Sequence, residues 1–360
     1  MDTVIVKAEF RGEWYVPHVW ERNMEDAGKV IKEGGIVAFP TETVYGLGGN
    51  ALEKKVAAKI YKAKGRPSDN PLIVHISSIS QAEDIAVNIS DAARKLMDEF
   101  WPGPLTIILK KSDVVPKETT GGLDTIAVRM PNHPIALRLI EAAGVPIAAP
   151  SANISGKPSP TTARHVAEDM SGRINMIVDG GAVGIGIEST IIDMTAEVPV
   201  ILRPGFVTKE MLEKVIGPVE EDKVVNAKSL EEIEGDDKPR APGMKYKHYA
   251  PKAELTIYEG STENVAAAIN KKVAQAIKNG KKPAVICSDE TISLYKAGCI
   301  KSIGTRAENG TIAYNLYHLL REFDDMEVDC IFGETFYGEA IGQAIMNRLI
   351  KAAGYHLEQV

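Results

Sequence analysis

Short apolar runs alternate with amphipathic segments over about residues 20–205 of the chain. Runs rich in β-branched residues predict strands there, and they read GGIVAFP, PLIVHI, LTIILK, TIAVRM, VPIAAP, MIVD and STIIDM. Between two of these runs, Leu52, Val56 and Ile60 lie on one side of a predicted helix whose other side carries lysines. The alternation predicts a mixed α/β domain over residues 1–205.

The composition changes over residues 206–254. This segment holds the charge-rich strings VEEDK and LEEIEGDDKPR and the proline-bracketed string APGMKYKHYAP, which are typical of a linker. The alternation then resumes, with AELTIY, PAVICS and DCIFGET as predicted strands and helical patterns over 262–279, 306–323 and 338–353. Residues 255–360 are therefore predicted to form a second, smaller α/β domain.

Composition and charge exclude several classes of protein. The chain is 44% hydrophobic and 25% charged, as globular proteins are, and its formal net charge of -7 gives no broad basic field for nucleic acid. The three cysteines have neither zinc-site nor disulfide-framework spacing, which fits a reduced cytoplasm. We find no signal peptide and no apolar segment of the ~20 residues that span a membrane, so we expect a cytoplasmic protein.

Polar motifs gather at the ends of the predicted strands, where open α/β sheets bind ligands. PTETVYG follows one strand, the loop 64–70 precedes another, SAN at 151–153 follows a third and EST at 188–190 opens a fourth. The prolines of the loop 64–70 predict an ordered loop, and its cations favour a binding site for an anion. A serine before Pro160 predicts a helix start whose amides could hold a phosphate. Each motif could instead be structural, as a turn cap, a surface ion pair or a core histidine.

Taken together, these motifs resemble a known family. KGR at 64–66 with SAN at 151–153 resembles the KxR…SxN signature of the YrdC-like family, and PTETVYGLG, FWPGPLT, AVRMP, APSANISG and LRPG follow in the family's order. The linker and second domain are similar to those of the long, two-domain threonylcarbamoyl-AMP synthases. The resemblance implies an N-terminal YrdC-like twisted mixed sheet and a C-terminal Rossmann-like α/β domain.

The resemblance also implies a reaction. In that family L-threonine, bicarbonate and ATP, accompanied by Mg²⁺, give L-threonylcarbamoyladenylate, water and pyrophosphate. A separate transferase then passes the threonylcarbamoyl group to an adenosine beside the anticodon of tRNA. The residues that would hold Mg²⁺ are not identified by the sequence.

Roles for single residues follow from this chemistry. Lys64 and Arg66 would neutralise the triphosphate and the charge that develops on it, an electrostatic role in catalysis. The other expected ATP contacts are Asn70, Thr125, Ser151, Asn153, Ser159, Arg203 and Tyr246. Arg129 can pair with the threonine carboxylate through two parallel hydrogen bonds. The rest of the expected threonine pocket consists of Thr41, Thr43, His75 and Ser189.

The linker string has more aromatic and basic residues than a tether needs. The product is a mixed anhydride that water destroys, so a segment that closes over the site would protect it. Lys245 and Lys247 could approach phosphates, and Tyr246 or Tyr249 could cover the nucleotide. The linker could instead simply pack between the two domains.

Two rival functions stay open. An RNA-binding module without adenylating activity is suggested by the basic segment from Lys54 to Arg66, although net charge and the lack of an aromatic stacking series oppose it. Direct tRNA binding is not decided by the sequence. A carbamoyl-transfer domain of the hydrogenase-maturation type would need zinc-finger cysteines and an acylphosphatase motif, and neither is found.

Overall fold

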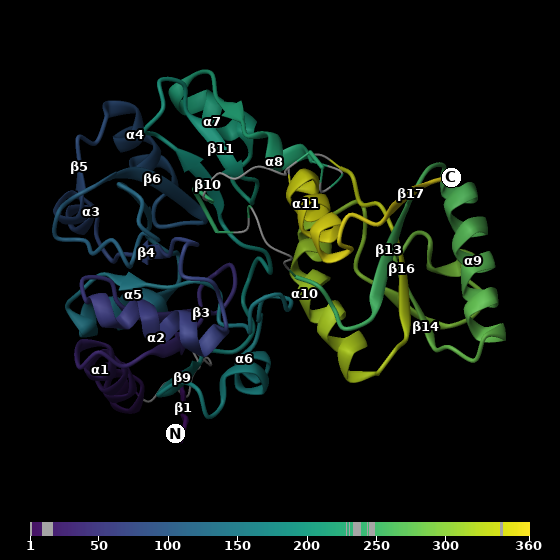
Figure 1. Cartoon of the computed structure of the whole chain (residues 1–360), viewed down its shortest axis with the longest axis horizontal. Coiled ribbons are helices and arrows are strands. Elements are labelled where there is room, and N and C mark those ends of the chain that lie inside the picture. Colours follow the sequence, from purple (N-terminus) through teal and green to yellow (C-terminus); the bar gives the residue numbers. More distant parts are fainter. Residues whose placement is uncertain are drawn as a thin grey trace.

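The computed structural model forms two α/β bodies joined by the linker (Figure 1). It describes residues 2–8, 17–227, 229, 231–232, 239–242, 244, 249–338 and 341–360. Each body is built on its own sheet, and the order of the helices and strands places the division between β12 and β13.

The first body contains a large twisted sheet of mixed direction. Its strands are β1 (Val4–Lys7), β2 (Val37–Phe39), β3 (Gly46–Asn50), β4 (Ile73–His75), β5 (Ala86–Val87), β6 (Leu105–Lys111), β7 (Thr125–Arg129), β8 (Ile147–Ala148), β9 (Met176–Asp179), β10 (Thr190–Asp193), β11 (Val200–Arg203) and β12 (Glu220–Glu221). Their order is β1-β9-β2-β3-β8-β4-β7-β6-β10-β11-β12, and β5 pairs with β6. Neighbours such as β4 and β7 are parallel, whereas β6 and β7 are antiparallel.

Helices cover both faces of this sheet. They are α1 (Pro17–Lys32), α2 (Lys54–Lys64), α3 (Ile79–Ile85), α4 (Asp91–Phe100), α5 (Pro134–Ala143), α6 (Ala163–Met170), α7 (Lys209–Ile216) and α8 (Lys223–Asn226). Val37 and Phe39 of β2 pack with α1 and α5, while Ala38 between them packs in the cluster that contains α2, α4 and α6. This period of two is expected of a strand buried on both faces.

The second body is a parallel sheet with helices on both faces. Its strands are β13 (Glu254–Glu259), β14 (Pro283–Cys287), β15 (Cys299–Ser302), β16 (Cys330–Glu334) and β17 (Leu357–Gln359), in the order β15-β14-β16-β13-β17. Helix α9 (Thr262–Lys278) covers the outer face, and the short helix η2 (Ile292–Leu294) follows β14. Helices α10 (Asn309–Asp325) and α11 (Gly342–Ala352) cover the face that meets the first body (Figure 1).

The predicted fold class is confirmed, and every strand predicted from an apolar run is present. Strand β3 was not predicted because its sequence, GLGGN, has little β-propensity. Its glycines are required by packing, since a Cβ on Gly48 would lie 2.5 Å from Ile147 Cγ2 and 2.6 Å from Phe39 Cε1. Within the described ranges no helix is long and apolar enough to cross a membrane, and the three cysteines form no disulfide.

Candidate active site

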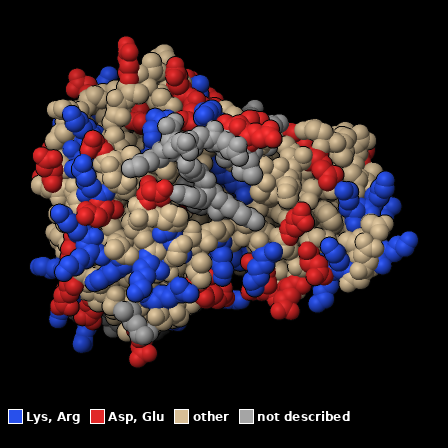
Figure 2. Space-filling model, viewed as in Figure 1, with Lys and Arg blue, Asp and Glu red and all other residues tan. Residues whose placement is uncertain are grey.

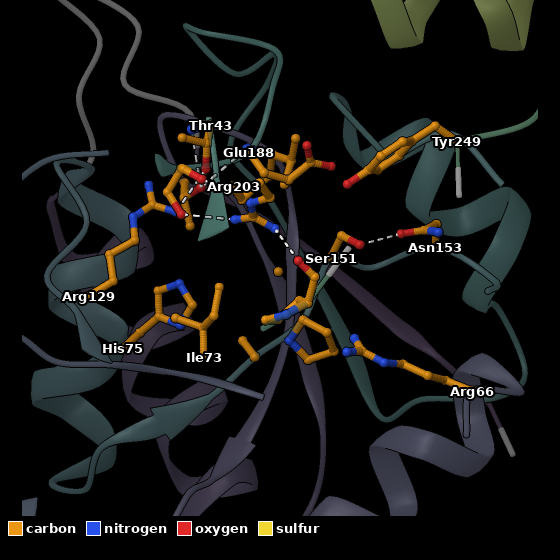
Figure 3. Close-up of a pocket in the computed structure, with 17 residues that line it drawn as sticks. Thr43, Arg66, Ile73, His75, Arg129, Ser151, Asn153, Glu188, Arg203 and Tyr249 are labelled. Atoms are coloured by element: carbon orange, nitrogen blue, oxygen red, sulfur yellow. Dashed lines mark hydrogen bonds between the residues drawn. The ribbon is translucent and has the colours of Figure 1, made fainter. Parts of the chain in front are cut away.

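The predicted strand-end motifs meet around one cavity (Figure 3). Its walls come from the β2–β3 loop, the loop after α2, strand β4, the ends of β7 and β11, the loop after β8 and the residues just before β10. The predicted site residues that line it are Thr41, Thr43, Arg66, His75, Arg129, Ser151, Asn153, Ser189 and Arg203. The linker adds Pro242 and Tyr249. Segments far apart in the sequence are therefore brought to the same end of the strands.

Arg129 is buried and held from three sides. Its Nη1 donates to Thr43 Oγ1 at 2.9 Å, its Nε donates to Gly103 O at 3.3 Å, and its Nη2 lies 2.7 Å from Glu42 Oε2. These contacts fix the plane of the guanidinium at the cavity wall. Glu42 itself does not line the cavity, and it supports Arg129 from outside it.

His75 is the neighbour of Arg129 across the pair β4–β7. Burial, together with the adjacent Arg129 guanidinium, lowers the pKa of His75 to about 3. The imidazole is therefore neutral at physiological pH. Its Nδ1 is buried and has no hydrogen-bond partner among the described residues, so a ligand in the cavity could supply one.

Arg203 and Ser189 form a further part of the cavity wall. Arg203 donates from Nε to Ser189 O at 3.0 Å, from Nη2 to Ser189 Oγ at 3.1 Å and from Nη1 to Pro242 O at 3.4 Å. The Ser189 hydroxyl is also 2.8 Å from Thr106 Oγ1. Burial lowers the pKa of Arg203 below its usual value. An anion bound beside it would offset that cost of burying the charge.

The two parts of the KxR…SxN signature contact each other directly. Gly65, with φ of 64°, ends α2 in the left-handed conformation and turns the chain after Lys64. Lys64 Nζ then donates to Asn153 O at 2.6 Å and to Ser151 O. Burial, and next the charge of Arg66, lower the pKa of Lys64 well below its usual value. In this structure Lys64 organises the SxN loop and does not line the cavity.

Arg66 enters the cavity from the side opposite Arg129 (Figure 3). Its Nη2 donates to Asn70 O at 3.3 Å and to Pro71 O at 3.2 Å, but Nε has no hydrogen-bond partner among the described residues. Burial lowers the pKa of Arg66 to about 10. Buried polar atoms nearly always have partners, so Nε is a candidate to bind a ligand in the cavity.

The remaining predicted nucleotide contacts do not line the cavity. Asn70 is buried next to Arg66, and its Oδ1 has no partner among the described residues. Thr125 begins β7 and Arg129 ends it, about 13 Å away along the strand. Ser159 is buried and donates to Glu188 Oε1 at 2.6 Å. Tyr246 lies outside the described residues.

Glu188 was missed as a site residue, although it lies in the EST motif. Glu188 lines the cavity, and its carboxylate accepts from Ser159, from Tyr317 OH at 2.9 Å and from Arg348 Nε at 3.1 Å. Burial alone would raise the pKa of Glu188, but the Arg348 and Arg203 cations and the Ser159 hydroxyl hold it below its usual value. Tyr317 and Arg348 lie more than a hundred positions away in the chain, and no local sequence signal connects them to Glu188.

Family comparisons match nearly all of the chain. Residues 29–205 match a family model described as "Telomere recombination", and residues 207–354 match one described as "Threonylcarbamoyl-AMP synthase, C-terminal domain". The chain belongs to the threonylcarbamoyl-AMP synthase family. The predicted family is thus confirmed, including its long, two-domain form.

Relatives from bacteria and archaea cover the whole of this family architecture. The Bacillus subtilis threonylcarbamoyl-AMP synthase is 50% identical over 347 residues, which are 95% of this chain and 97% of that protein. The Pyrococcus abyssi enzyme of the same name is 51% identical over 334 residues, or 93% and 95% of the two chains. A crystal structure of Pyrococcus abyssi Sua5 complexed with L-threonine superposes with a TM-score of 0.90, at 48% identity, over 99% of this chain and 100% of that one.

Proposed function

We propose that this protein is a nucleotidyltransferase that joins L-threonine, bicarbonate and ATP into L-threonylcarbamoyladenylate, with release of pyrophosphate and water. The observation that carries the proposal is the convergence of three guanidinium groups, those of Arg66, Arg129 and Arg203, on one cavity. The threonine carboxylate, bicarbonate and the triphosphate are all anions. Three separately held cations suit a reaction in which three anions must come together.

The threonine end of the site is assigned to Arg129, with His75, Thr43 and Ser189 around it. Arg129 is already oriented by three contacts, so a carboxylate can pair with it at little further cost in side-chain entropy. Val44 and Ile73 also line the cavity and offer an apolar surface to the threonine methyl group. The L-threonine complex of the Pyrococcus abyssi relative supports the choice of amino acid.

The nucleotide end is assigned to Arg66, Arg203 and the SxN loop. Arg66 reaches the cavity from the loop after α2 and Arg203 from the end of β11, so they can meet phosphates from two sides. Lys64 stabilises the loop that carries Ser151 and Asn153, and its positive charge lies next to that of Arg66. We keep Lys64 as a charge that helps to neutralise the triphosphate, although its ammonium group is fully engaged in this structure.

The chemistry then needs positioning more than proton transfer. The threonine ammonium group first loses a proton to solvent, and the neutral amine then joins bicarbonate with loss of water, so the resulting carbamate carries a negative charge. One carbamate oxygen attacks the α-phosphorus, the bond to the pyrophosphate oxygen breaks, and pyrophosphate leaves. Because the attacking carbamate is already an anion, and because the pKa of about 3 makes His75 a weak base, we assign no general base.

We expect ATP to be used as its Mg²⁺ complex, in which the ion neutralises phosphate charge. Within the described part of the chain, no group of three or more His, Cys, Asp or Glu side chains could hold a metal. Mg²⁺ commonly binds through substrate phosphates with few protein ligands, so this donor set fits an ion that arrives with the nucleotide. Arg66 and Arg203 would then share the remaining phosphate charge.

The linker is proposed to close over the site during the reaction. Of its described residues, Pro242 and Tyr249 line the cavity, and Pro242 O accepts from Arg203. A linker that only joined the domains would not need to contact a catalytic arginine. The predicted roles of Lys245, Tyr246 and Lys247 lie outside the described residues and stay predictions.

Product analysis tests this function directly. The purified full chain, incubated with L-threonine, ATP, Mg²⁺ and ¹³C-bicarbonate, should give a product whose mass equals that of threonylcarbamoyladenylate with one ¹³C. A mass without the label, or AMP formed equally well without threonine, would refute it. We further propose that the product is consumed in the cytoplasm by a separate transferase that modifies tRNA.

A second candidate, RNA binding without adenylation, is favoured by one surface feature. Figure 2 shows Lys and Arg side chains gathered at the lower left of the molecule, where Figure 1 places α2. A groove there is lined by Lys59, Lys62 and Arg173. Salt-sensitive tRNA binding by a protein that releases no pyrophosphate would favour this function over the first.

A further inference from the structure

Helix α10 of the second body faces the loops that build the active site (Figure 1). A Cβ on Gly186 would lie 2.5 Å from Ala313 O, so the helix backbone directly abuts the loop before Glu188. One turn later Tyr317 donates to Glu188, and one turn further Arg321 donates to Asp169 and to Pro158 O, each at 2.7 Å. Residues four apart lie on one face of a helix, so a single face of α10 contacts all of these segments of the first body.

Arg348 of α11 connects the segment before β10 to the segment after β11. It is completely buried, with its Nε on Glu188 Oε2, its Nη2 on Glu188 O at 3.4 Å and its Nη1 on Pro204 O. Glu188 precedes Ser189, and Pro204 follows Arg203. The guanidinium of Arg348 therefore holds the backbone next to Ser189 and next to Arg203, which both line the cavity.

Tyr317 connects this wall to the linker. Its hydroxyl donates to Glu188, while its ring stacks on that of Tyr249 with centroids 5.2 Å apart. Tyr249 and Glu188 both line the cavity (Figure 3). A displacement of Tyr317 would therefore affect the wall and the linker at the same time.

We propose that Tyr317 and Arg348 are positioning residues, through which the C-terminal domain holds Glu188 and completes the active site. Neither residue lines the cavity, so they act through Glu188 on Ser159, Ser189 and Arg203. The role of the C-terminal domain is then to set the geometry of the catalytic wall. This inference rests on the proposed function, because it is measured by the rate of that reaction.

The chain contains a matched control for this cluster. Tyr295 OH also donates to a buried carboxylate, Glu334, which accepts from Arg306 Nη2 at 2.6 Å. Tyr295 packs with α9, on the sheet face opposite α10 and α11. Tyr295→Phe therefore removes the same kind of hydrogen bond from the same domain without contacting the active site.

The first experiment compares pyrophosphate release by full-length wild type, Tyr317→Phe, Glu188→Gln, their double variant and Tyr295→Phe, with a thermal melt of each. We expect Tyr317→Phe to lower kcat/KM roughly tenfold for both threonine and ATP, because a hydrogen bond to a charged group is lost. Tyr295→Phe should shift the melting temperature similarly and leave kcat/KM unchanged. The double variant should match Glu188→Gln alone, since Tyr317 acts through Glu188.

The second experiment removes the cation. Arg348→Met leaves Glu188 buried without its charged partner, so both melting temperature and kcat/KM should fall. The double variant Arg348→Met with Glu188→Gln removes that unpaired charge and should recover the melting temperature but not kcat/KM.

Some outcomes would overturn the inference while leaving the proposed function intact. The first is a folded Tyr317→Phe variant with wild-type kcat/KM. The second is a Tyr317→Phe, Glu188→Gln double variant whose fold-loss in kcat/KM equals the product of the losses in the two single variants. The third is full recovery of kcat/KM in the Arg348→Met, Glu188→Gln double variant. A wild-type protein that releases no pyrophosphate with threonine and bicarbonate would instead refute the proposed function.

Discussion

Both sheets gather polar side chains at one end of their strands, but they use them differently. In the second sheet, Arg306 donates to Ser288 Oγ at 3.1 Å, to Thr335 O at 3.0 Å and to Glu334 Oε2 at 2.6 Å, so all three of its nitrogens have partners. In the first sheet, Arg66 Nε and His75 Nδ1 are buried and have no hydrogen-bond partner among the described residues.

The difference separates a structural network from a binding site. A closed network stabilises the domain and has no capacity left for a ligand, whereas buried polar atoms without partners carry a cost that a ligand can remove. Both ends carry an arginine and a serine after an apolar strand, so residue type alone does not distinguish them. The pairing of the arginines does, because every guanidinium nitrogen of Arg306 has a partner, whereas Arg66 Nε has none among the described residues.

The largest expected loss of activity follows from replacing Arg66. Arg66→Ala should lower kcat/KM for ATP by about 100-fold to 1,000-fold, because a cation that stabilises the charge developing on the phosphates is lost. Arg306→Ala should destabilise the second domain and keep activity near the wild-type value. Pyrophosphate release and a thermal melt on both variants provide the measurement, and equal loss of activity in the two would remove the distinction between the sheets.

Replacing Arg129 should affect the use of threonine and not the use of ATP. Arg129→Ala should raise KM for threonine by about 100-fold with little change in KM for ATP, since the carboxylate loses a charged, two-point partner. Steady-state kinetics with each substrate varied in turn gives both values. A variant that binds threonine normally but fails with ATP would reverse our assignment of the two ends.

The amino-acid sequence of the linker should matter for activity, and not only its length. Replacing residues 243–249 with a Gly/Ser stretch of equal length should lower product formation about tenfold or more, because a covering segment that excludes water is lost. Circular dichroism and a thermal melt should show both domains still folded. Full turnover by a folded variant would reduce the linker to a tether.

Serine should be a poorer substrate than threonine. The cavity offers Val44 and Ile73 to the methyl group, and one methyl is worth roughly 10-fold to 200-fold in discrimination. Competition between the two amino acids, followed by mass spectrometry of the products, gives the ratio of kcat/KM. A ratio near one would show that the methyl group has no apolar contact.

The smallest expected effect is that of His75 on how the stability of the fold depends on pH. His75 has a pKa of about 3 in the folded chain, against about 6.5 when unfolded, so below pH 6.5 only the unfolded chain takes up this proton. The free energy of unfolding should therefore fall by about 1.4 kcal/mol per pH unit from this group as pH decreases from 6.5 toward 3. Urea titrations at several pH values should show a smaller slope in His75→Gln, and equal slopes would mean that the imidazole is not buried.

The apolar pattern predicted the fold well, because both sheets are built largely from β-branched runs. Strand β3 escaped prediction because close packing against Phe39 and Ile147 requires glycine, which the pattern reads as a loop. The strand-end motifs predicted most of the cavity wall, since strand ends meet at one end of a sheet.

Contacts between distant elements were beyond the sequence. The ion pair of Glu188 with Arg348 joins residues 160 positions apart, and no sequence feature near Arg348 connects it to the EST motif that contains Glu188. The sequence also gave no indication that Lys64 donates to the SxN loop rather than into the cavity. Such details depend on how the two bodies pack, which local pattern does not report.

A crystal structure of the full chain with L-threonine and a non-hydrolysable ATP analogue tests the distinction between the two sheets most directly. We predict both ligands in the cavity of the first sheet, with the threonine carboxylate on Arg129 and phosphate oxygens on Arg66. Nucleotide bound at the Ser288 and Arg306 end of the second sheet, or an empty cavity at saturating ligand, would contradict it.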